Sequence, residues 1–95
     1  MIRPAVMASD VDRAIAKVED AYSQCASPKG AGAFASSHEA VGVIAEEFYE
    51  LVDAVRSHTT STTREYGIAS ARVDHEIIDL AVACVHALAS RPYMD

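Results

Sequence analysis

The sequence is poor in cysteine, in basic residues and in long apolar runs. Its 95 residues include two cysteines, and 8 Lys and Arg against 14 Asp and Glu give a formal net charge of −6. Because phosphates demand a basic protein face, this composition argues against nucleic-acid binding. The most apolar run, residues 77–89, is interrupted by Asp79 and His86 and is too short to cross a bilayer. Since the N-terminus also lacks an apolar segment typical of a signal peptide, we expect a soluble, cytoplasmic protein without membrane partners.

The two cysteines, Cys25 and Cys84, are far apart, and neither belongs to a Cys-x-x-Cys pair. This spacing does not indicate a redox pair or a thiolate metal site. Each cysteine lies on an apolar helical stripe, so we expect reduced cysteines in the core of the protein.

Apolar residues recur at intervals of three and four over three segments, which predicts three helices. The first is expected to run from a capping box that begins at Ser9 to Cys25. The second is expected to run from a similar box that begins at Ser36 to about Ser57. Segments 27–32, with Pro and two Gly, and 58–63, rich in Thr, are predicted to be connectors.

The third helical pattern ends before Pro92 and contains Gly67, which indicates a break, so this helix is expected to begin properly near Ser70. The chain shows neither strand-like alternation nor an internal repeat. We therefore expect one all-α domain over residues 1–95, a three-helix antiparallel chain.

The fraction of hydrophobic residues is high for so short a chain. A domain of this length has a marginal core, yet 51% of the residues are hydrophobic. Excess apolar surface on a small helical chain is commonly buried against a partner subunit. We therefore expect an oligomeric helical bundle, either a homodimer or a homotetramer.

Two acidic residues lie inside the apolar arcs of the second and third predicted helices. At about 100° per residue, Glu47 and Glu76 both have alanines as their nearest neighbours on the helical wheel. Glu50 and Asp79 lie three residues later, at the rim of each arc. Because residues three apart face the same way, each helix presents a pair of carboxylates, and the two pairs are expected to converge.

Four carboxylates cannot share a small, partly buried site unless protons or cations enter it. Ligands that are all oxygen atoms favour Mg²⁺ or Mn²⁺ over Zn²⁺. A di-iron bundle needs Glu-x-x-His pairs, and neither His75 nor His86 follows a glutamate at that spacing. Each acidic motif alone is typical of a solvated helix face, but their joint placement favours a metal site.

The two acidic motifs read "EEFYE" at residues 46–50 and "EIID" at residues 76–79. With their flanks, residues 37–55 and 73–90, they resemble the MazG-like all-α nucleotide pyrophosphohydrolases, in which EExxE is followed at variable distance by ExxD. The flanks are similar to short MazG-like proteins, including those common in phages and prophages. The resemblance implies an enzyme that splits a nucleoside triphosphate between its α- and β-phosphates, releases pyrophosphate and a monophosphate, and serves nucleotide-pool house-cleaning.

The resemblance also implies roles for individual residues. The ligands of Mg²⁺, or of Mn²⁺, would be Glu47, Glu50, Glu76 and Asp79. Glu46 would support these ligands without binding the ion itself, or would help to orient water. Glu46 and Glu47 are therefore the expected catalytic residues.

Candidate contacts to the substrate are Arg72, His38 and Lys17. An arginine in the position of Arg72 more often forms a surface ion pair than a phosphate contact, and a lysine like Lys17 more often lies on a solvated helix face. For a histidine at the start of a helix, such as His38, simple exposure to solvent and contact with nucleotide are about equally frequent. A second class of function stays open: a non-catalytic helical oligomerisation or regulatory module with a vestigial acidic site.

Overall fold

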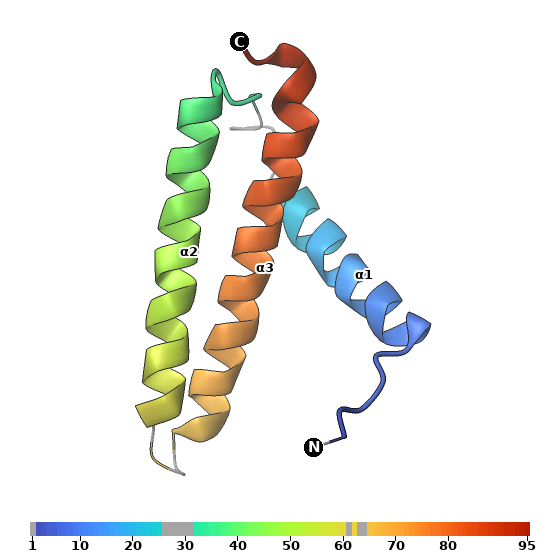
Figure 1. The fold of residues 1–95 in the computed structure, drawn as a ribbon, viewed down its shortest axis with the longest axis vertical. Helices are drawn as coiled ribbons and strands as arrows, with labels where there is room; N and C mark the ends of the chain where they lie inside the picture. The colour runs from blue at the N-terminus through green and yellow to red at the C-terminus, as the bar shows by residue number, and fades with distance from the viewer. Residues whose placement is uncertain (1, 26–31, 61, 63–64) are drawn as a thin grey trace.

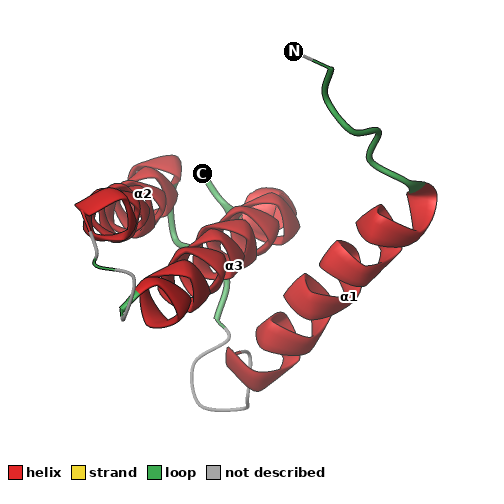
Figure 2. Ribbon diagram, turned by 90° about the horizontal axis from the view of Figure 1, so that it is seen from below, coloured by secondary structure: helices red, strands yellow, loops and turns green. Residues whose placement is uncertain are grey.

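The computed structural model describes residues 2–25, 32–60, 62 and 65–95. Three α-helices and a short 3-10 helix follow one another: α1 (Ala8–Cys25), α2 (Ser37–Thr60), α3 (Tyr66–Ser90) and η1 (Arg91–Tyr93). Helices α2 and α3 run antiparallel side by side, and α1 packs against α3 on the side away from α2 (Figures 1 and 2). The described residues contain no strand, so the all-α, three-helix prediction is confirmed.

None of the three described helices combines the length and the apolar character that a membrane span requires.

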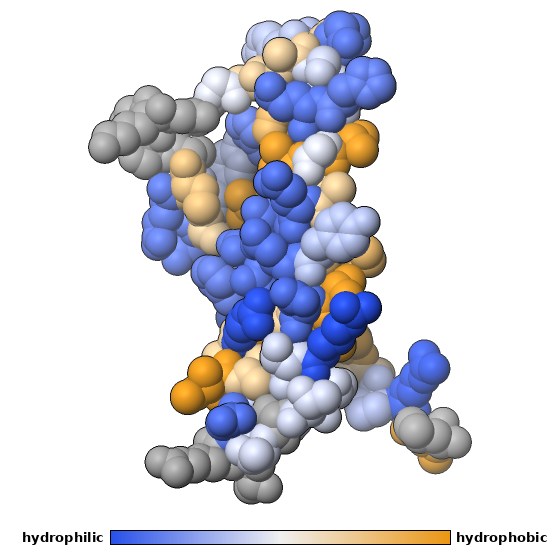
Figure 3. All heavy atoms as spheres, turned by 90° about the vertical axis from the view of Figure 1, so that its left-hand side faces the viewer, coloured by the Kyte–Doolittle hydropathy of each residue, from blue (hydrophilic) through white to orange (hydrophobic). Residues whose placement is uncertain are grey.

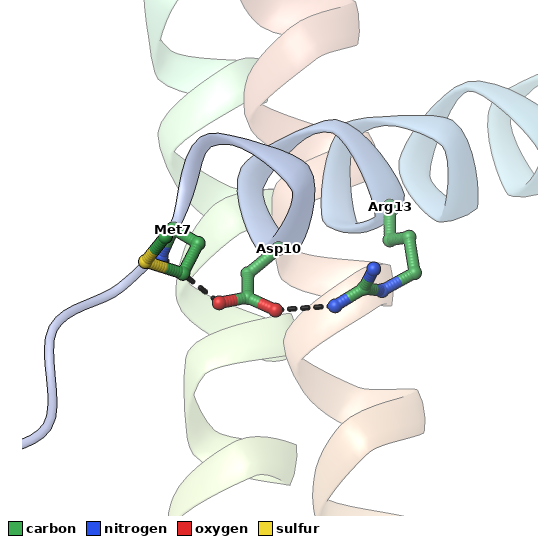
Figure 4. A network of polar contacts seen from close by, with 3 residues as sticks. All are labelled: Met7, Asp10 and Arg13. Carbon is green, nitrogen blue, oxygen red and sulfur yellow. Dashed lines mark hydrogen bonds and ion pairs between the residues drawn. The ribbon is translucent and has the colours of Figure 1, made fainter.

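Helix α1 begins slightly earlier than the predicted start at Ser9. The Met7 carbonyl accepts the N–H groups of Asp10 and Val11 at 3.0 and 3.2 Å. The Asp10 carboxylate in turn accepts the Met7 N–H at 2.9 Å and pairs with Arg13 (Figure 4). Met7 is therefore the N-cap residue, and Asp10 returns the bond as the third residue of a capping box does.

The predicted cap of α2 at Ser36 is confirmed, because its hydroxyl oxygen accepts the N–H three residues later at 3.1 Å. The helix continues past its predicted end near Ser57. The hydroxyl groups of Thr59 and Thr60 donate to the Arg56 carbonyl at 2.9 and 3.0 Å. Such bonds from threonine hydroxyls to a carbonyl three or four residues earlier are common local contacts of these residues in helices.

The prediction that Gly67 delays α3 to Ser70 is wrong, because the helix begins at Tyr66. Gly67 falls in the first turn of this helix. Glycine keeps its backbone N–H, and its cost of about 1 kcal/mol relative to alanine applies to helix interiors. The helix ends at Ser90, before Pro92, as the sequence predicted, and Pro92 itself lies within η1. Most of the connector predicted at 27–32, and residues 61, 63 and 64 of the other, lie outside the described residues.

The contact between α2 and α3 is made by small side chains. Ala40 and Ala54 on α2 and Ala83 on α3 are 5%, 0% and 7% exposed, and within the described segments they form the whole buried apolar core. Because the distance between packed helices depends on the side chains at the contact, alanines allow the two helices to lie close together.

Several residues predicted to lie in the core are exposed. Helix α1 has no buried residue, Ile15 on its apolar stripe is 50% exposed, and Phe48 on α2 is 52% exposed. Cys25 and Cys84 are free, as predicted, but both are exposed. Helical periodicity identifies the side chains that share a face, but it does not show whether the same chain supplies a neighbour to cover that face.

A histidine on α3 makes the polar attachment of α1. The His86 Nε2 atom lies 2.9 Å from the Gly32 carbonyl oxygen, and Nδ1 lies 2.8 Å from the Tyr22 hydroxyl on α1. A carbonyl can only accept, so Nε2 carries hydrogen, and Nδ1 of the neutral ring accepts from Tyr22. The edge of the Phe34 ring meets the imidazole, with centroids 4.7 Å apart. His86 thus joins three segments of the chain.

Replacing Tyr22 by Phe removes the hydroxyl that donates to His86 Nδ1 and keeps the aromatic ring of residue 22. We expect a loss of about 1 kcal/mol in the free energy of unfolding, measured by urea denaturation. Tyr93→Phe is the matched control, because Tyr93 is 78% exposed, and its change should be within about 0.5 kcal/mol of zero. Equal losses in the two variants would contradict the attachment.

Candidate metal centre

The structure brings four carboxylates from two helices together. One oxygen from each of Glu47, Glu50, Glu76 and Asp79 lies within 4.8 Å of the others. The pairs converge because α2 and α3 lie side by side and each pair spans three residues on one side of its helix. Glu47 is seven residues from both Ala40 and Ala54, and seven residues bring a side chain back to nearly the same face.

One oxygen atom of each of the two central glutamates is buried without a hydrogen-bond partner. Glu76 is only 9% exposed, and Glu47 is partly buried. The Oε2 atom of each is buried and accepts no hydrogen bond. Buried carboxylate oxygens are normally satisfied, since leaving one unpaired carries a desolvation cost. The geometry therefore provides two oxygen atoms suited to a proton or a cation.

Burial raises the pKa of both Glu47 and Glu76 above the ordinary value of 4.5. Repulsion from the Glu50 and Asp79 carboxylates raises the pKa of each further, and His75 partly opposes the effect on Glu76. Both causes disfavour the charged form of the acids. A divalent cation between the two acids would supply opposite charge and would favour their charged forms instead.

A histidine at the edge of the cluster was not predicted. His75 Nε2 lies 3.2 Å from Asp79 Oδ2, and His75, Glu76 and Asp79 form a second group whose potential ligand atoms lie within 4.8 Å of one another. The His75 side chain is 68% exposed, so it borders the cluster on the solvent side. Its spacing of four residues from Asp79 is the sequence signal that could have identified it.

The other predicted site residues lie outside the four-carboxylate cluster. Glu46 is exposed and points about 100° around α2 from Glu47. Arg72 is exposed, one turn before Glu76. His38, in the first turn of α2, is about 13 Å along the helix axis from Glu47. Lys17 is exposed on α1, and α3 stands between that helix and α2 (Figure 2).

No family model, curated protein or solved structure matches the chain.

The raised pKa values predict a stability that depends on pH in the absence of metal. Since the folded-state pKa of Glu47 and Glu76 lies above 4.5, their protonation stabilises the folded chain fully below that pH. This stabilisation is lost as the pH rises through the folded-state pKa. In EDTA, we expect the contribution of the cluster to lower Tm progressively as the pH rises above 4.5.

Glu47→Gln removes one of these charges and keeps the shape of the side chain. We expect this variant to melt at a higher temperature than the wild type at neutral pH without metal, with a flatter pH profile. Glu46→Gln makes the same change at an exposed neighbouring position and should follow the wild-type profile. If the two variants behave alike, the cluster is not the origin of the pH dependence.

Proposed function

We propose that this protein is a nucleoside triphosphate pyrophosphohydrolase of the MazG-like type, dependent on Mg²⁺ or Mn²⁺. The observation that carries the proposal is the convergence of four carboxylates, two of them with buried, unpartnered oxygens, from the motifs EEFYE and EIID. These are the motifs on which the resemblance to that family rests. The order and spacing of the acids and their placement on two adjacent helices are what such a site needs.

The donor set supports a hard cation. The four-residue group offers only carboxylate oxygens, which suit Mg²⁺ and Mn²⁺. Glu47, Glu50, Glu76 and Asp79 would hold the ion or ions. A bound cation of this kind screens the charge of a triphosphate and activates a water molecule for attack on phosphorus.

The chain's own residues position the substrate and the water. Glu50 is exposed beside Glu47 and Glu76, so the cluster opens to solvent on this side. Glu46, which also faces solvent, accepts a proton from water or orients it. A surface depression of about 280 Å³ on α2 includes Glu50 and Tyr49 and is bordered by Arg56. Arg72, exposed on α3 one turn before Glu76, is the basic side chain that we assign to the phosphates.

Binding of the cation should stabilise the folded chain. At about 100 times its Kd, an ion that binds only the folded state contributes about 2.7 kcal/mol, which raises Tm by roughly 10–20 °C for a domain of this length. We expect this shift with Mg²⁺ or Mn²⁺ in thermal melts of the wild type. Glu76→Gln should lose most of it, and Glu46→Gln should keep it. An unchanged wild-type Tm, or an equal shift in Glu76→Gln, would refute the cation site.

Release of pyrophosphate from a panel of canonical and modified nucleoside triphosphates tests the activity itself. We expect pyrophosphate and a monophosphate as products, with activity reduced to background in Glu47→Gln. Glu46→Gln should lower kcat while it retains the Tm shift with cation, because its proposed role concerns water and not the ion. Release of orthophosphate in place of pyrophosphate would contradict cleavage between the α- and β-phosphates.

A non-catalytic helical module is the second candidate. The observation that favours it is the large amount of exposed apolar side chain on all three helices, which includes Ile15, Phe48 and Leu88. This candidate is supported if the melts do not respond to Mg²⁺ or Mn²⁺ and no nucleotide in the panel is cleaved.

A further inference from the structure

A histidine and two of the four carboxylates form a group of their own on α3. One potential ligand atom from each of His75, Glu76 and Asp79 lies within 4.8 Å of the other two. The three residues belong to the stretch HEIID, residues 75–79. Because this group adds an imidazole nitrogen to the carboxylate oxygens, its donor set differs from the one that suits Mg²⁺.

The spacing of His75 and Asp79 is that of a metal-binding pair on a helix. Residues four apart lie on one face, and zinc proteins with a His-Glu-x-x-His helix use this spacing for two of their ligands. In HEIID the second of these positions holds an aspartate, and aspartate is also a zinc ligand. The sequence therefore places a nitrogen and an oxygen donor where one ion can meet both.

The distance between the two side chains fits two ligands of one ion. His75 Nε2 lies 3.2 Å from Asp79 Oδ2. Two ligand atoms, each about 2.0–2.2 Å from a common ion, are about 3.0 Å apart at a right angle and about 3.4 Å apart in a tetrahedral arrangement. The observed separation falls between these two values. An ion pair between the two side chains gives a similar distance, so the third residue of the group decides between the two interpretations.

Glu76 has a buried oxygen that an ion pair between His75 and Asp79 does not satisfy. Glu76 is 9% exposed, and its Oε2 atom is buried without a hydrogen-bond partner. If His75 and Asp79 only neutralised each other, this oxygen would keep its desolvation cost. An ion held by the pair would lie next to the Glu76 carboxylate, because all three residues belong to one group.

The charge of the carboxylate cluster is large enough for a second ion. Four ionised carboxylates carry four negative charges, and one divalent cation neutralises half of that charge. Glu76 and Asp79 belong both to the four-carboxylate group and to the group with His75. A carboxylate has two oxygen atoms, so one side chain is able to bind two neighbouring ions.

Within the described residues, the group with His75 is the one place that combines nitrogen and oxygen donors in this way. The outer side of α2, turned away from α3, is mainly hydrophilic (Figure 3), but hydrophilic surface alone does not bring three ligands together. The four-carboxylate group is the other set of three or more potential ligands in the described part of the chain. Cys25 and Cys84 belong to neither group, so neither thiol is part of a competing chelate there.

We propose that His75, Glu76 and Asp79 form a second cation site, which binds a transition-metal ion such as Zn²⁺ in preference to Mg²⁺. Imidazole nitrogen suits Zn²⁺, whereas Mg²⁺ favours oxygen ligands. The His75 side chain is 68% exposed, so water has access to complete the coordination, as in zinc sites with three protein ligands. The site is a property of these three side chains and does not rest on the nucleotide chemistry proposed above.

Nitrogen-15 NMR of the imidazole rings tests the site in the wild type. The chain has 4 histidines, and an equimolar amount of Zn²⁺ should give a coordination shift at a ring nitrogen of His75 before any other. The same amount of Mg²⁺ should give no such shift, since Mg²⁺ does not favour nitrogen ligands. A Zn²⁺ titration that leaves the His75 ring unshifted, or that shifts another histidine in its place, overturns the proposal.

His75→Gln removes the nitrogen ligand from an exposed position and keeps a polar side chain there. In competition with a chelating dye, we expect Zn²⁺ binding to weaken by about tenfold or more, because loss of a group that only supports a metal ligand already costs about tenfold. His38→Gln is the matched control, since His38 is exposed on α2 and belongs to neither group. Equal Zn²⁺ affinities in His75→Gln and the wild type would show that His75 and Asp79 form only a surface ion pair.

The response to Mg²⁺ distinguishes this site from the four-carboxylate group. His75→Gln keeps all four carboxylates, so it should keep the rise in Tm that Mg²⁺ gives to the wild type. Loss of that rise together with Zn²⁺ binding would place His75 in the Mg²⁺ site and would overturn a separate site. The Zn²⁺ titrations contain neither Mg²⁺ nor nucleotide, so their outcome is independent of whether the chain hydrolyses nucleoside triphosphates.

Discussion

The close approach of α2 and α3 is the constraint on which the rest of the structure depends. Ala40, Ala54 and Ala83 are the buried apolar side chains of this contact, and none of them extends beyond Cβ. A larger side chain at any of these positions would push the helix axes apart. Glu47 and Glu76 are each seven residues from a buried alanine on their own helix, so they lie on the same faces as the alanines. Moving the helix axes apart would therefore also separate the carboxylates.

The contact and the cluster have opposite effects on stability. The alanine contact favours the helix pair, while the desolvation and mutual repulsion of the acids oppose it. The stability of the helix pair is therefore coupled to whatever neutralises the acids, as folding is coupled to binding in proteins that use charged side chains as ligands.

Local signals in the sequence predicted most of the fold. The spacing of apolar residues and the cap at Ser36 identify the helices, because both depend on interactions within a few residues. The position of Glu47 and Glu76 on the apolar arcs led to the expectation that four acids meet, and the structure does bring them within 4.8 Å. Their roles as ligands stay a prediction.

The features that the sequence did not predict depend on tertiary structure. Val11 and Phe48 lie on regular apolar stripes, but none of the described helices covers them, so they are 45% and 52% exposed. The attachment of α1 through His86 joins residues 64 positions apart, and no local pattern indicates such a contact. Gly67 misled the prediction because the effect of glycine depends on its position within a helix.

The small apolar core of a single copy also affects how its folding responds to temperature. The heat capacity change on unfolding arises mainly from apolar surface that becomes hydrated, and typical domains show about 12–15 cal/mol/K per residue. One copy of this chain has little apolar surface left to hydrate, because so many of its apolar side chains already contact water. Its heat capacity increment is therefore small, and its stability curve is flatter than that of an ordinary domain, without a pronounced maximum near room temperature.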